Sequence, residues 1–350
     1  MNNWKKIILN PNDTIQKAIK ILDKEALQLI LIANKDKKLI GTVSDGDIRR
    51  ALIKNLDMDT KLSKIMFTEP TYCHKDISKE KLLNLMKTKE VLQIPIVNKD
   101  LKILGLKTIN NLIGNKNIIP KKIDNPVLLM AGGFGKRLEP LTKKVPKPMI
   151  KITDKSLLEI TLERLVDSGF FNFFISTHYK SEIITKYFGD GSKWGVNITY
   201  IKEKKPLGTA GSISLISKKL NKPLLVVNSD LVTKANFKDI IKFHSKKKSA
   251  ATLCVRKYDF QLPYGVIETK NGNATKITEK PLQKFFVNAG IYILNHNVLK
   301  TLKVNKKIHM TDLLSNIIKN NMKVSIYPIY EYWIDVGKIE NLKKAKKEME

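Results

Sequence analysis

The chain has 350 residues, 42% of them hydrophobic, which is enough for two domains that each bury a core. It has no apolar run near the about 20 residues that span a bilayer, and its start lacks the apolar segment of a signal peptide. The formal net charge of +31 invites a nucleic-acid interpretation, but only five of the 64 basic residues are arginine, so we expect neither a nucleic-acid nor a membrane partner. The two cysteines, Cys73 and Cys254, lie far apart and lack zinc-ligand spacing, which favours a reduced, cytoplasmic compartment.

The first 119 residues contain an internal repeat. Residues 29–41 match residues 93–105, an offset of 64 positions, and both segments carry an Asn-Lys-Asp turn between apolar runs. Each copy predicts a helix, a strand, a hairpin turn, a second strand and a closing helix. We expect the two copies to stack face to face, so that together they bury apolar surface that a single copy would leave exposed. The expected repeats are residues 1–62 and 63–119, with opening helices at 14–23 and 78–87.

The repeat resembles the CBS domain pair, a regulatory module that commonly binds adenine nucleotides. The resemblance implies that Ser44 and Asp47 of the first copy hold ribose and phosphate. The second copy has Thr108 and Asn111 at the matching positions, so its acid is missing and at most one good ribose site is expected. AMP or ATP is then the implied ligand. The alternative is that the pair serves only in dimerisation or spacing.

Residues 120–126 form a polar, proline-bracketed linker, and a different pattern follows it over residues 127–350. Strands and helices alternate there, which predicts an α/β domain with a mostly parallel sheet. Ligands of such sheets bind at the carboxyl ends of strands, so residues directly after strands are the candidates. Strands are expected at 127–130, 173–175, 196–201 and 223–228, and helices at 156–168 and 182–188.

A glycine-rich loop follows the first of these strands. Three glycines fall within four positions, and Arg137 and a proline-flanked Lys147 come soon after. Glycines let a ligand approach backbone N–H groups closely, arginine binds phosphate through two parallel hydrogen bonds, and lysine adds a point charge. The spacing fits neither a Walker loop nor the dinucleotide fingerprint. The loop therefore indicates a cradle for a polyphosphate, with the candidate residues Ala131, Gly132, Gly133, Gly135 and Lys136.

The string Gly-Gly-x-Gly-x-Arg-Leu-x-Pro-Leu-Thr, followed by Pro-Lys-Pro, resembles the sugar-1-phosphate nucleotidylyltransferases. The resemblance implies a Rossmann-like mixed, mostly parallel sheet of the glycosyltransferase-A type. It also implies catalytic roles for Arg137 and Lys147. Lys136 departs from the family, which usually has threonine or a small residue there, so a hydroxyl contact from this position is lost.

Two aspartates end apolar runs in the second half of the chain. Asp230 follows the strand at 223–228, and Asp335 lies between aromatic and β-branched residues. A buried unpaired carboxylate is costly, and a shared divalent cation resolves that cost. Carboxylate oxygens suit Mg²⁺, which the family resemblance also implies as the cofactor at this pair.

The resemblance assigns the remaining substrate contacts. The loop residues Leu207, Gly208, Thr209 and Gly211 line the base and ribose pocket through their backbone; Thr209 alone also fits a helix N-cap. Asn271-Gly272 predicts a hairpin turn, and the flanking strands carry the sugar contacts. The implied sugar-site residues are Gly265, Glu279 and Asn288, with Lys280 holding the phosphate of the sugar.

The implied reaction is transfer of a nucleoside monophosphate from an NTP to a sugar-1-phosphate, with release of pyrophosphate. The CBS pair ahead of a single transferase domain looks like the bacterial guanylyltransferases that act on glucosamine-1-phosphate in legionaminic acid synthesis. GTP is then the expected NTP. A mannose- or heptose-1-phosphate guanylyltransferase or another NDP-sugar pyrophosphorylase is the alternative, and a homodimer is expected. A hypothesis of another class is an adenine-nucleotide sensor whose transferase half is inactive.

Overall fold

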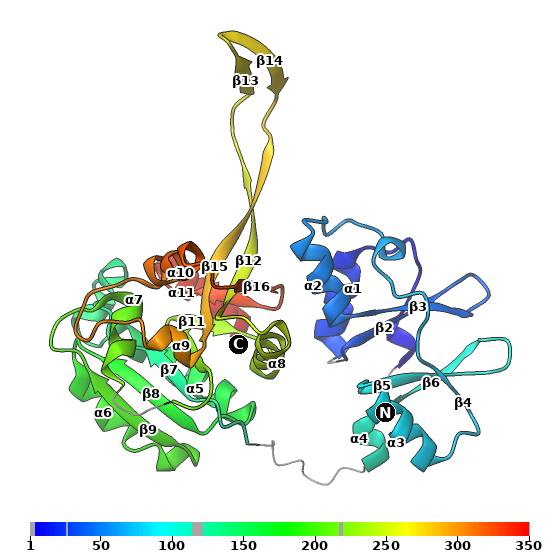
Figure 1. The fold of residues 1–350 in the computed structure, drawn as a ribbon, viewed down its shortest axis with the longest axis horizontal. Coiled ribbons are helices and arrows are strands. Elements are labelled where there is room, and N and C mark those ends of the chain that lie inside the picture. The colour runs from blue at the N-terminus through cyan, green and yellow to red at the C-terminus, as the bar shows by residue number, and fades with distance from the viewer. Residues whose placement is uncertain (1–3, 26, 114–121, 217–219, 350) are drawn as a thin grey trace. The chain divides into compact units, whose positions relative to one another are not determined.

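We describe the protein from a computed structural model, which covers residues 4–25, 27–113, 122–216 and 220–349. The chain forms two compact units, Met1–Ile119 and Pro120–Glu350, and each is described by itself (Figure 1). Positions 120 and 121 of the expected linker lie outside the described residues. Within those ranges, no helix combines the length and apolar character needed to cross a membrane.

The first unit consists of two similar halves. The first half contains β1 (Ile8–Leu9), α1 (Ile15–Glu25), β2 (Leu29–Ala33), β3 (Leu39–Ser44) and α2 (Asp45–Ile53). The second half contains β4 (Cys73–His74), α3 (Lys79–Thr88), β5 (Gln93–Val97), β6 (Ile103–Thr108) and α4 (Ile109–Ile113). The expected helix and strand order is confirmed in both halves. The short leading strands β1 and β4, parallel to β2 and β5, are additions that the sequence pattern did not predict.

The 64-residue offset is preserved in the strand register. Leu29 lies opposite Ser44 in the first half, and Gln93 lies opposite Thr108 in the second, with a bulge at the equivalent place in each. The two hairpins also meet each other, because the Leu39 N–H donates to the Leu101 carbonyl at 2.8 Å and, at the positions related by the same offset, the Ile103 N–H donates to the Lys37 carbonyl at 3.2 Å. The repeats therefore associate through equivalent backbone positions, as stacked copies of one unit would.

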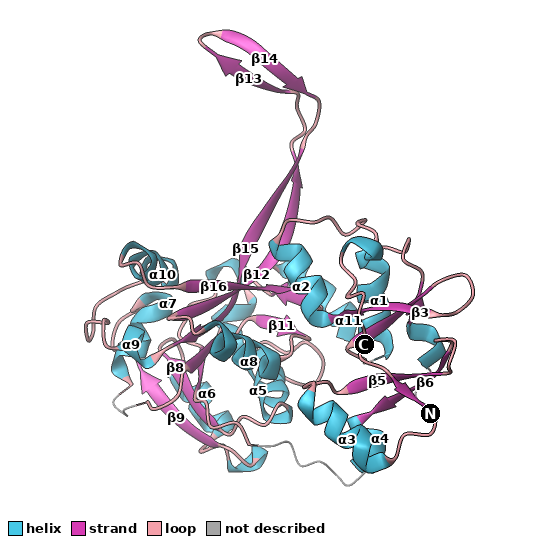
Figure 2. Ribbon diagram, turned by 45° about the vertical axis from the view of Figure 1, so that its right-hand side comes forward, coloured by secondary structure: helices cyan, strands magenta, loops and turns pink. Residues whose placement is uncertain are grey.

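The second unit is an α/β domain built on one large sheet (Figure 2). The strand order is β16-β12-β15-β10-β7-β8-β9, and the sheet pairings are parallel except those of β15 with β10 and β12. This confirms the expected mixed, mostly parallel sheet. Its strands are β7 (Val127–Met130), β8 (Asn172–Thr177), β9 (Asn197–Lys202), β10 (Leu224–Asn228), β12 (Ala251–Gln261), β15 (Leu282–Leu294) and β16 (Val324–Ile329).

Two helices of this unit begin at a side-chain cap. Ser156 accepts the Glu159 N–H at the start of α5, and Asn236 accepts two N–H groups at the start of α8. The apolar faces of α5, α6 and α8 pack on the central strands in one continuous core. The helices are α5 (Leu157–Asp167), α6 (Ser181–Phe188), α7 (Gly208–Gly211), α8 (Phe237–Lys247), α9 (His296–Leu299), α10 (Met310–Lys319) and α11 (Ile339–Met349).

Two small sheets complete the unit. β11 (Leu231–Thr233) pairs with β17 (Trp333–Asp335), directly after the carboxyl end of β10. β13 (Val266–Lys270) and β14 (Asn273–Thr278) form a hairpin whose turn residues Asn271 and Gly272 both have positive φ, as expected for Asn-Gly. The hairpin stands at the end of a two-stranded ribbon made by β12 and β15, away from the sheet (Figures 1 and 2).

Candidate active site

The pairing of β11 with β17 brings the two predicted metal ligands together. Leu231 lies opposite Asp335 in this antiparallel ladder, and the Val336 N–H donates to the Asp230 carbonyl at 2.9 Å. Asp230 follows β10 at the carboxyl edge of the parallel strands. Two acids that are far apart in the sequence are thus held side by side by backbone hydrogen bonds.

Lys147 is the cation that faces these carboxylates. Its Nζ donates to Asp230 Oδ2 at 2.5 Å and lies 4.0 Å from Asp335 Oδ1, and its side chain is only 11% exposed. Burial raises the pKa of Asp335, and the neighbouring Asp230 carboxylate raises that pKa further, while Lys147 and Arg137 oppose the shift. One lysine therefore compensates two partly buried acids incompletely.

The remaining carboxylate oxygens fit a hard cation. Asp230 Oδ1 and Asp335 Oδ1 are buried without a hydrogen-bond partner in the described part of the chain. Such orphaned oxygens are costly unless a ligand satisfies them. No group of three or more His, Cys, Asp or Glu side chains able to hold a metal occurs among the described residues. Two carboxylates nevertheless suffice for Mg²⁺ where substrate phosphates and water complete its shell.

The glycine loop packs tightly beside Lys147. Gly135 has φ +67, and a Cβ there would lie 2.8 Å from Lys147 Cβ and from Thr142 Cγ2. Arg137 is exposed, and its guanidinium lies against the Gly337 backbone, where a Cβ would meet Arg137 Nη2 and Asp335 Oδ1 at 3.1 Å each. The loop thus brings Arg137 to the edge of the carboxylate pair. Nothing in the described structure explains Lys136, which is exposed.

A cavity of about 240 Å³ connects the glycine loop, the base loop and the first carboxylate. Gly133 lies at an open position, with room on the cavity side for a ligand to approach its backbone. Of the predicted site residues, the cavity walls contain Gly132, Gly133, Lys147, Gly208, Thr209 and Asp230. They also contain the unpredicted residues Met130, Phe134, Pro148, Glu203, Pro206, Asn228 and Ser229.

Glu203 is the charged residue of this cavity that sequence reasoning missed. It is 9% exposed, its Oε2 accepts the Leu207 N–H at 3.0 Å, and a Cβ on Gly132 would lie 2.8 Å from its Oε1. Burial raises its pKa, against a smaller lowering by the Leu207 hydrogen bond. The signal was present, because Glu203 directly follows β9, as Asp230 follows β10.

The predicted base-binding loop, residues 207–211 (the base loop), packs against the segment that precedes α10. Gly208 has φ +78, and a Cβ there would lie 2.6 Å from the Ile308 carbonyl. The Ala210 N–H donates to that carbonyl at 3.1 Å, and a Cβ on Gly211 would lie 2.9 Å from the Lys306 carbonyl oxygen. The alternative that Thr209 is the N-cap of the helix that follows the loop is wrong: Thr209 lies inside α7, and its hydroxyl instead accepts the N–H of Met310, the first residue of α10, at 2.8 Å.

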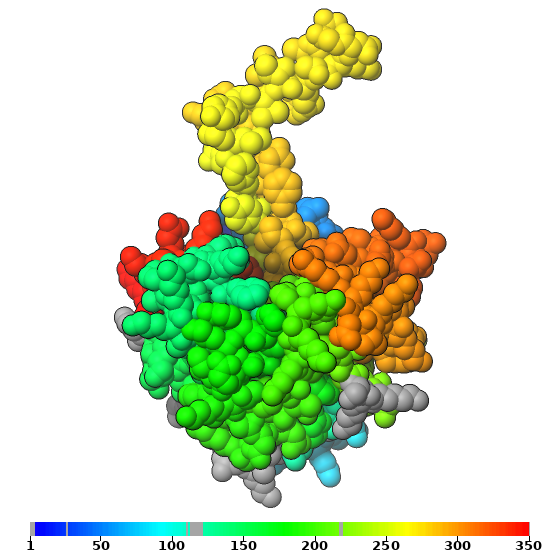
Figure 3. Space-filling model, turned by 90° about the vertical axis from the view of Figure 1, so that its left-hand side faces the viewer, coloured from blue at the N-terminus to red at the C-terminus, as the bar shows by residue number. Residues whose placement is uncertain are grey.

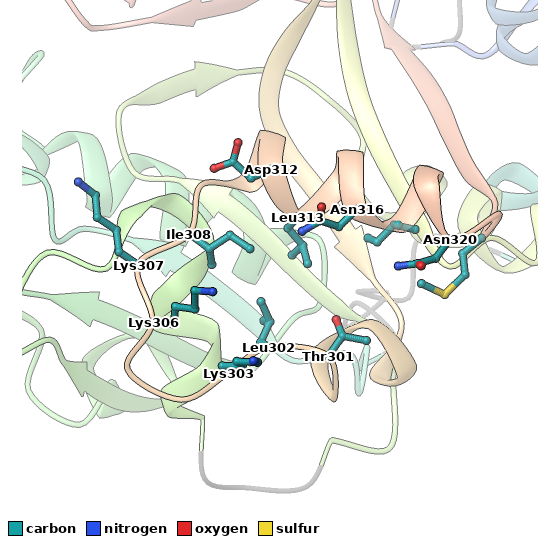
Figure 4. Close-up of a pocket in the computed structure, with 12 residues that line it drawn as sticks. Thr301, Leu302, Lys303, Lys306, Lys307, Ile308, Asp312, Leu313, Asn316 and Asn320 are labelled. Carbon is teal, nitrogen blue, oxygen red and sulfur yellow. The ribbon is translucent and has the colours of Figure 1, made fainter.

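Leu207, another predicted base-loop residue, is buried, and its carbonyl accepts the Ile308 N–H at 2.9 Å, so it anchors the loop from within. The supporting segment borders a second cavity of about 440 Å³. Figure 4 shows Leu313 and Asn316 on α10, and Asn320 just after it, above Thr301 and Leu302. This cavity contains none of the predicted catalytic residues.

The predicted sugar contacts lie on the ribbon and its hairpin. Gly265 and Glu279 face each other near the hairpin, where a Cβ on the glycine would meet Glu279 Oε2 at 2.9 Å. Glu279 and Lys280 are exposed, and the Lys280 Nζ lies 3.9 Å from Glu279 Oε1. Asn288 lies at the root of the ribbon, where it donates to the Tyr292 hydroxyl and accepts the Gly290 N–H. Figures 1 and 2 show the hairpin away from β11, the strand that begins directly after Asp230.

The predicted CBS contacts are engaged with the protein itself. Asp47 Oδ2 accepts the Ser44 N–H at 2.8 Å and the Ser44 hydroxyl at 2.6 Å, which closes a capping box at the start of α2. Arg50 pairs with the other oxygen of Asp47. In the second half, Thr108 Oγ1 accepts the Asn111 N–H. Their role toward a nucleotide stays a prediction.

Comparisons with known proteins match both units. Residues 126–350 match the family model described as nucleotidyl transferase, and residues 4–54 and 62–113 match that of the CBS domain. A probable mannose-1-phosphate guanylyltransferase 2 of Oryza sativa subsp. japonica is 35% identical over 221 residues, 60% of each chain. A mannose-1-phosphate guanyltransferase 2 of Candida glabrata is 34% identical over 221 residues with the same coverage. The match thus spans about three fifths of these curated relatives.

Solved structures match the transferase unit. HddC from Yersinia pseudotuberculosis has a TM-score of 0.52 and 26% identity, over 65% of this chain and all of that one. A putative glucose-1-phosphate thymidylyltransferase from Bacillus anthracis has a TM-score of 0.53 over 63% of this chain and 94% of that one, and at 22% identity it shows the fold alone. Because the family model matches residues 126–350, the chain belongs to the nucleotidyl transferase family. It also carries two CBS repeats ahead of its transferase unit.

Proposed function

We propose that the chain transfers a nucleoside monophosphate from an NTP to a sugar-1-phosphate. A phosphate oxygen of the sugar-1-phosphate attacks the α-phosphorus, the bond from that phosphorus to the β-phosphate oxygen breaks, and pyrophosphate leaves. The observation that carries the proposal is the pairing of β11 with β17, which holds Asp230 and Asp335 beside Lys147, where Lys147 and Asp230 line a cavity shared with the glycine loop.

This chemistry needs positioning and charge neutralisation more than proton transfer, because the nucleophile is already an anion. Lys147 would neutralise charge near the α-phosphate. Arg137 and the N–H groups of the glycine loop would bind the departing β- and γ-phosphates. Asp230 and Asp335 would hold Mg²⁺, which when bound supplies further neutralisation of the phosphate oxygens.

We propose GTP as the preferred donor on the strength of Glu203 and the guanylyltransferase relatives. A buried carboxylate accepts hydrogen bonds and donates none when ionised. The Watson–Crick edge of guanine offers two adjacent donors, N1–H and the N2 amino group. Uracil and thymine offer one N–H between two carbonyls, which a carboxylate repels.

For the acceptor we propose glucosamine-1-phosphate, on the CBS-plus-transferase arrangement, as in legionaminic acid synthesis. Mannose-1-phosphate is the alternative that the relatives favour. The test is pyrophosphate release from a panel of NTPs and sugar-1-phosphates with Mg²⁺. Release with GTP and one of these sugars supports the proposal, and release with another base or sugar redirects it within the family. If no combination of NTP and sugar-1-phosphate releases pyrophosphate, the proposal is overturned.

The CBS pair completes the proposal as a regulatory module that binds AMP or ATP. Ser44 and Asp47 would bind the ribose and phosphate, and Thr108 would take the equivalent place in the second half. Calorimetric titration with AMP and ATP tests this. Binding combined with a silent transferase panel would favour the alternative, an adenine-nucleotide sensor with an inactive transferase half.

A further inference from the structure

The ribbon formed by β12 and β15 leaves its neighbours early. β16 pairs with β12 only as far as Arg256, and β10 pairs with β15 only from Ile291 on. Beyond those residues β12 and β15 pair only with each other, in five successive positions from Lys257–Phe286 to Gln261–Leu282. At about 3.3 Å per residue this adds about 15 Å of two-stranded ribbon before the hairpin begins. In the space-filling view the yellow ribbon extends beyond the green and orange segments (Figure 3).

One face of this ribbon is aromatic. Tyr258 lies directly opposite Phe285, and Phe260 follows two positions on, so their side chains share a face. They are 53%, 52% and 45% exposed. The opposite face pairs Asp259 with Lys284. A two-stranded ribbon is marginally stable alone, and a contiguous exposed apolar patch marks an interaction surface. The aromatic face therefore requires a covering partner.

The end of the ribbon identifies that partner. It carries Gly265, Glu279 and Lys280, the residues that the proposed function assigns to the sugar and its phosphate. The carboxylate pair lies on the body, so each copy has a sugar-binding tip away from its own metal site (Figure 2). Reciprocal exchange of ribbons between two copies satisfies both needs, because a twofold contact repeats itself on the other side. It also covers the aromatic face.

We propose that the β12–β15 ribbon and its hairpin reach the active site of a second copy of the chain. Glu279 and Lys280 of one copy then bind the sugar phosphate beside Asp230 and Asp335 of the other. Each active site is thus built from two copies. This inference rests on the proposed function for the role of the tip.

Mixed dimers test the exchange directly. One copy carries Asp230→Asn and the other Lys280→Ala, with different affinity tags, and the heterodimer is purified through both tags after co-expression. Each homodimer should be inactive. The heterodimer should recover about half of the wild-type rate per dimer, because one of its two sites combines an intact body with an intact tip. A heterodimer as inactive as its parents would overturn the exchange.

The reciprocal pair serves as the matched control. A copy with both substitutions, paired with a wild-type copy, should be inactive, since each site then contains one lesion. Half of the wild-type rate in this pair would show that each tip serves its own body, and would overturn the proposal. Near wild-type turnover of the Lys280→Ala homodimer would do so too, as would a wild-type chain that sediments as a monomer during turnover.

The contact can also be tested without catalysis, which separates it from failure of the proposed function. Hydrogen exchange of residues 257–261 and 282–286 should slow at least severalfold as the protein concentration rises. The double substitution Tyr258→Ser and Phe285→Ser should abolish that dependence. Leu282→Ser, an exposed apolar residue on the opposite face, should leave it intact. Exchange that is independent of concentration in the wild-type chain would overturn the contact.

Discussion

At the scale of single residues, the site depends on three charges that compensate one another incompletely. Lys147 bonds to one oxygen of Asp230 and lies within ion-pair range of Asp335, which leaves two buried carboxylate oxygens unsatisfied. A fold that tolerates such a cost without a ligand is unusual. The two unsatisfied oxygens therefore support the proposed binding of a cation at this pair.

Replacing Asp230 by Asn should abolish turnover, by a factor of about 10³ or more, while the fold persists. The substitution keeps the shape but removes the charge that compensates Lys147 and would hold the cation. Steady-state kinetics and circular dichroism measure the two effects. Asp167→Asn, at the exposed end of α5, is the control that should leave turnover unchanged. Near-normal activity of the Asp230→Asn variant would refute the metal assignment.

Glu203→Gln should weaken selection of the base. An amide presents one acceptor and one donor to the two donors of guanine, so kcat/KM for GTP should fall about tenfold or more relative to UTP. Competition between the two nucleotides in one reaction measures the ratio. An unchanged ratio would remove Glu203 from base recognition.

The same substitution should change the pH dependence of stability. Burial raises the pKa of Glu203 above its unfolded value, so ionising this carboxyl costs stability as the pH rises through and beyond the unfolded pKa. The melting temperature of the Gln variant, relative to that of the wild type, should therefore increase as the pH rises from about 4 to about 7. A constant difference across that range would contradict the assigned cause.

At the scale of elements, sequence patterns predicted those parts whose signals are local. The helix starting after Ser156 follows from a hydroxyl cap before an apolar periodicity, and the β13–β14 turn from Asn271-Gly272. The β11–β17 pairing has no local signal, because three-residue strands far apart in the chain are specified only by the folded context. The same holds for α7, a four-residue helix set by its contacts with Ile308 and Met310.

Gly208→Ala should damage the base loop. The substitution would place a Cβ 2.6 Å from the Ile308 carbonyl at a positive φ, so α7 must move. KM for the NTP should rise about tenfold or more, a misplacement effect. Gly195→Ala is a matched control, since its φ is also positive at +68 but its Cβ would meet nothing within 4 Å. Equal effects of the two variants would mean that backbone strain, and not the contact with Ile308, is responsible.

At the scale of the whole molecule, the chain joins a duplicated CBS module to a transferase unit. The duplication could be predicted from the sequence because both copies carry the same Asn-Lys-Asp turn, 64 residues apart. The strand register shows the same offset. The transferase family was readable from the glycine string and its Pro-Lys-Pro partner. The ribbon that carries Glu279 and Lys280 away from the body could not be predicted from the sequence. Alternation along a strand shows which residues share a face, but it does not show what that face packs against.

Nucleotidyl transfer at the Asp230–Asp335 edge can be tested in one measurement. Phosphorus NMR of the wild-type chain with GTP, Mg²⁺ and a sugar-1-phosphate follows every phosphorus atom at once. We expect loss of the sugar-phosphate signal, appearance of a coupled diphosphate pair, and pyrophosphate in equal amount. Orthophosphate with GDP would instead mean hydrolysis of the γ-phosphate, and would contradict the transfer.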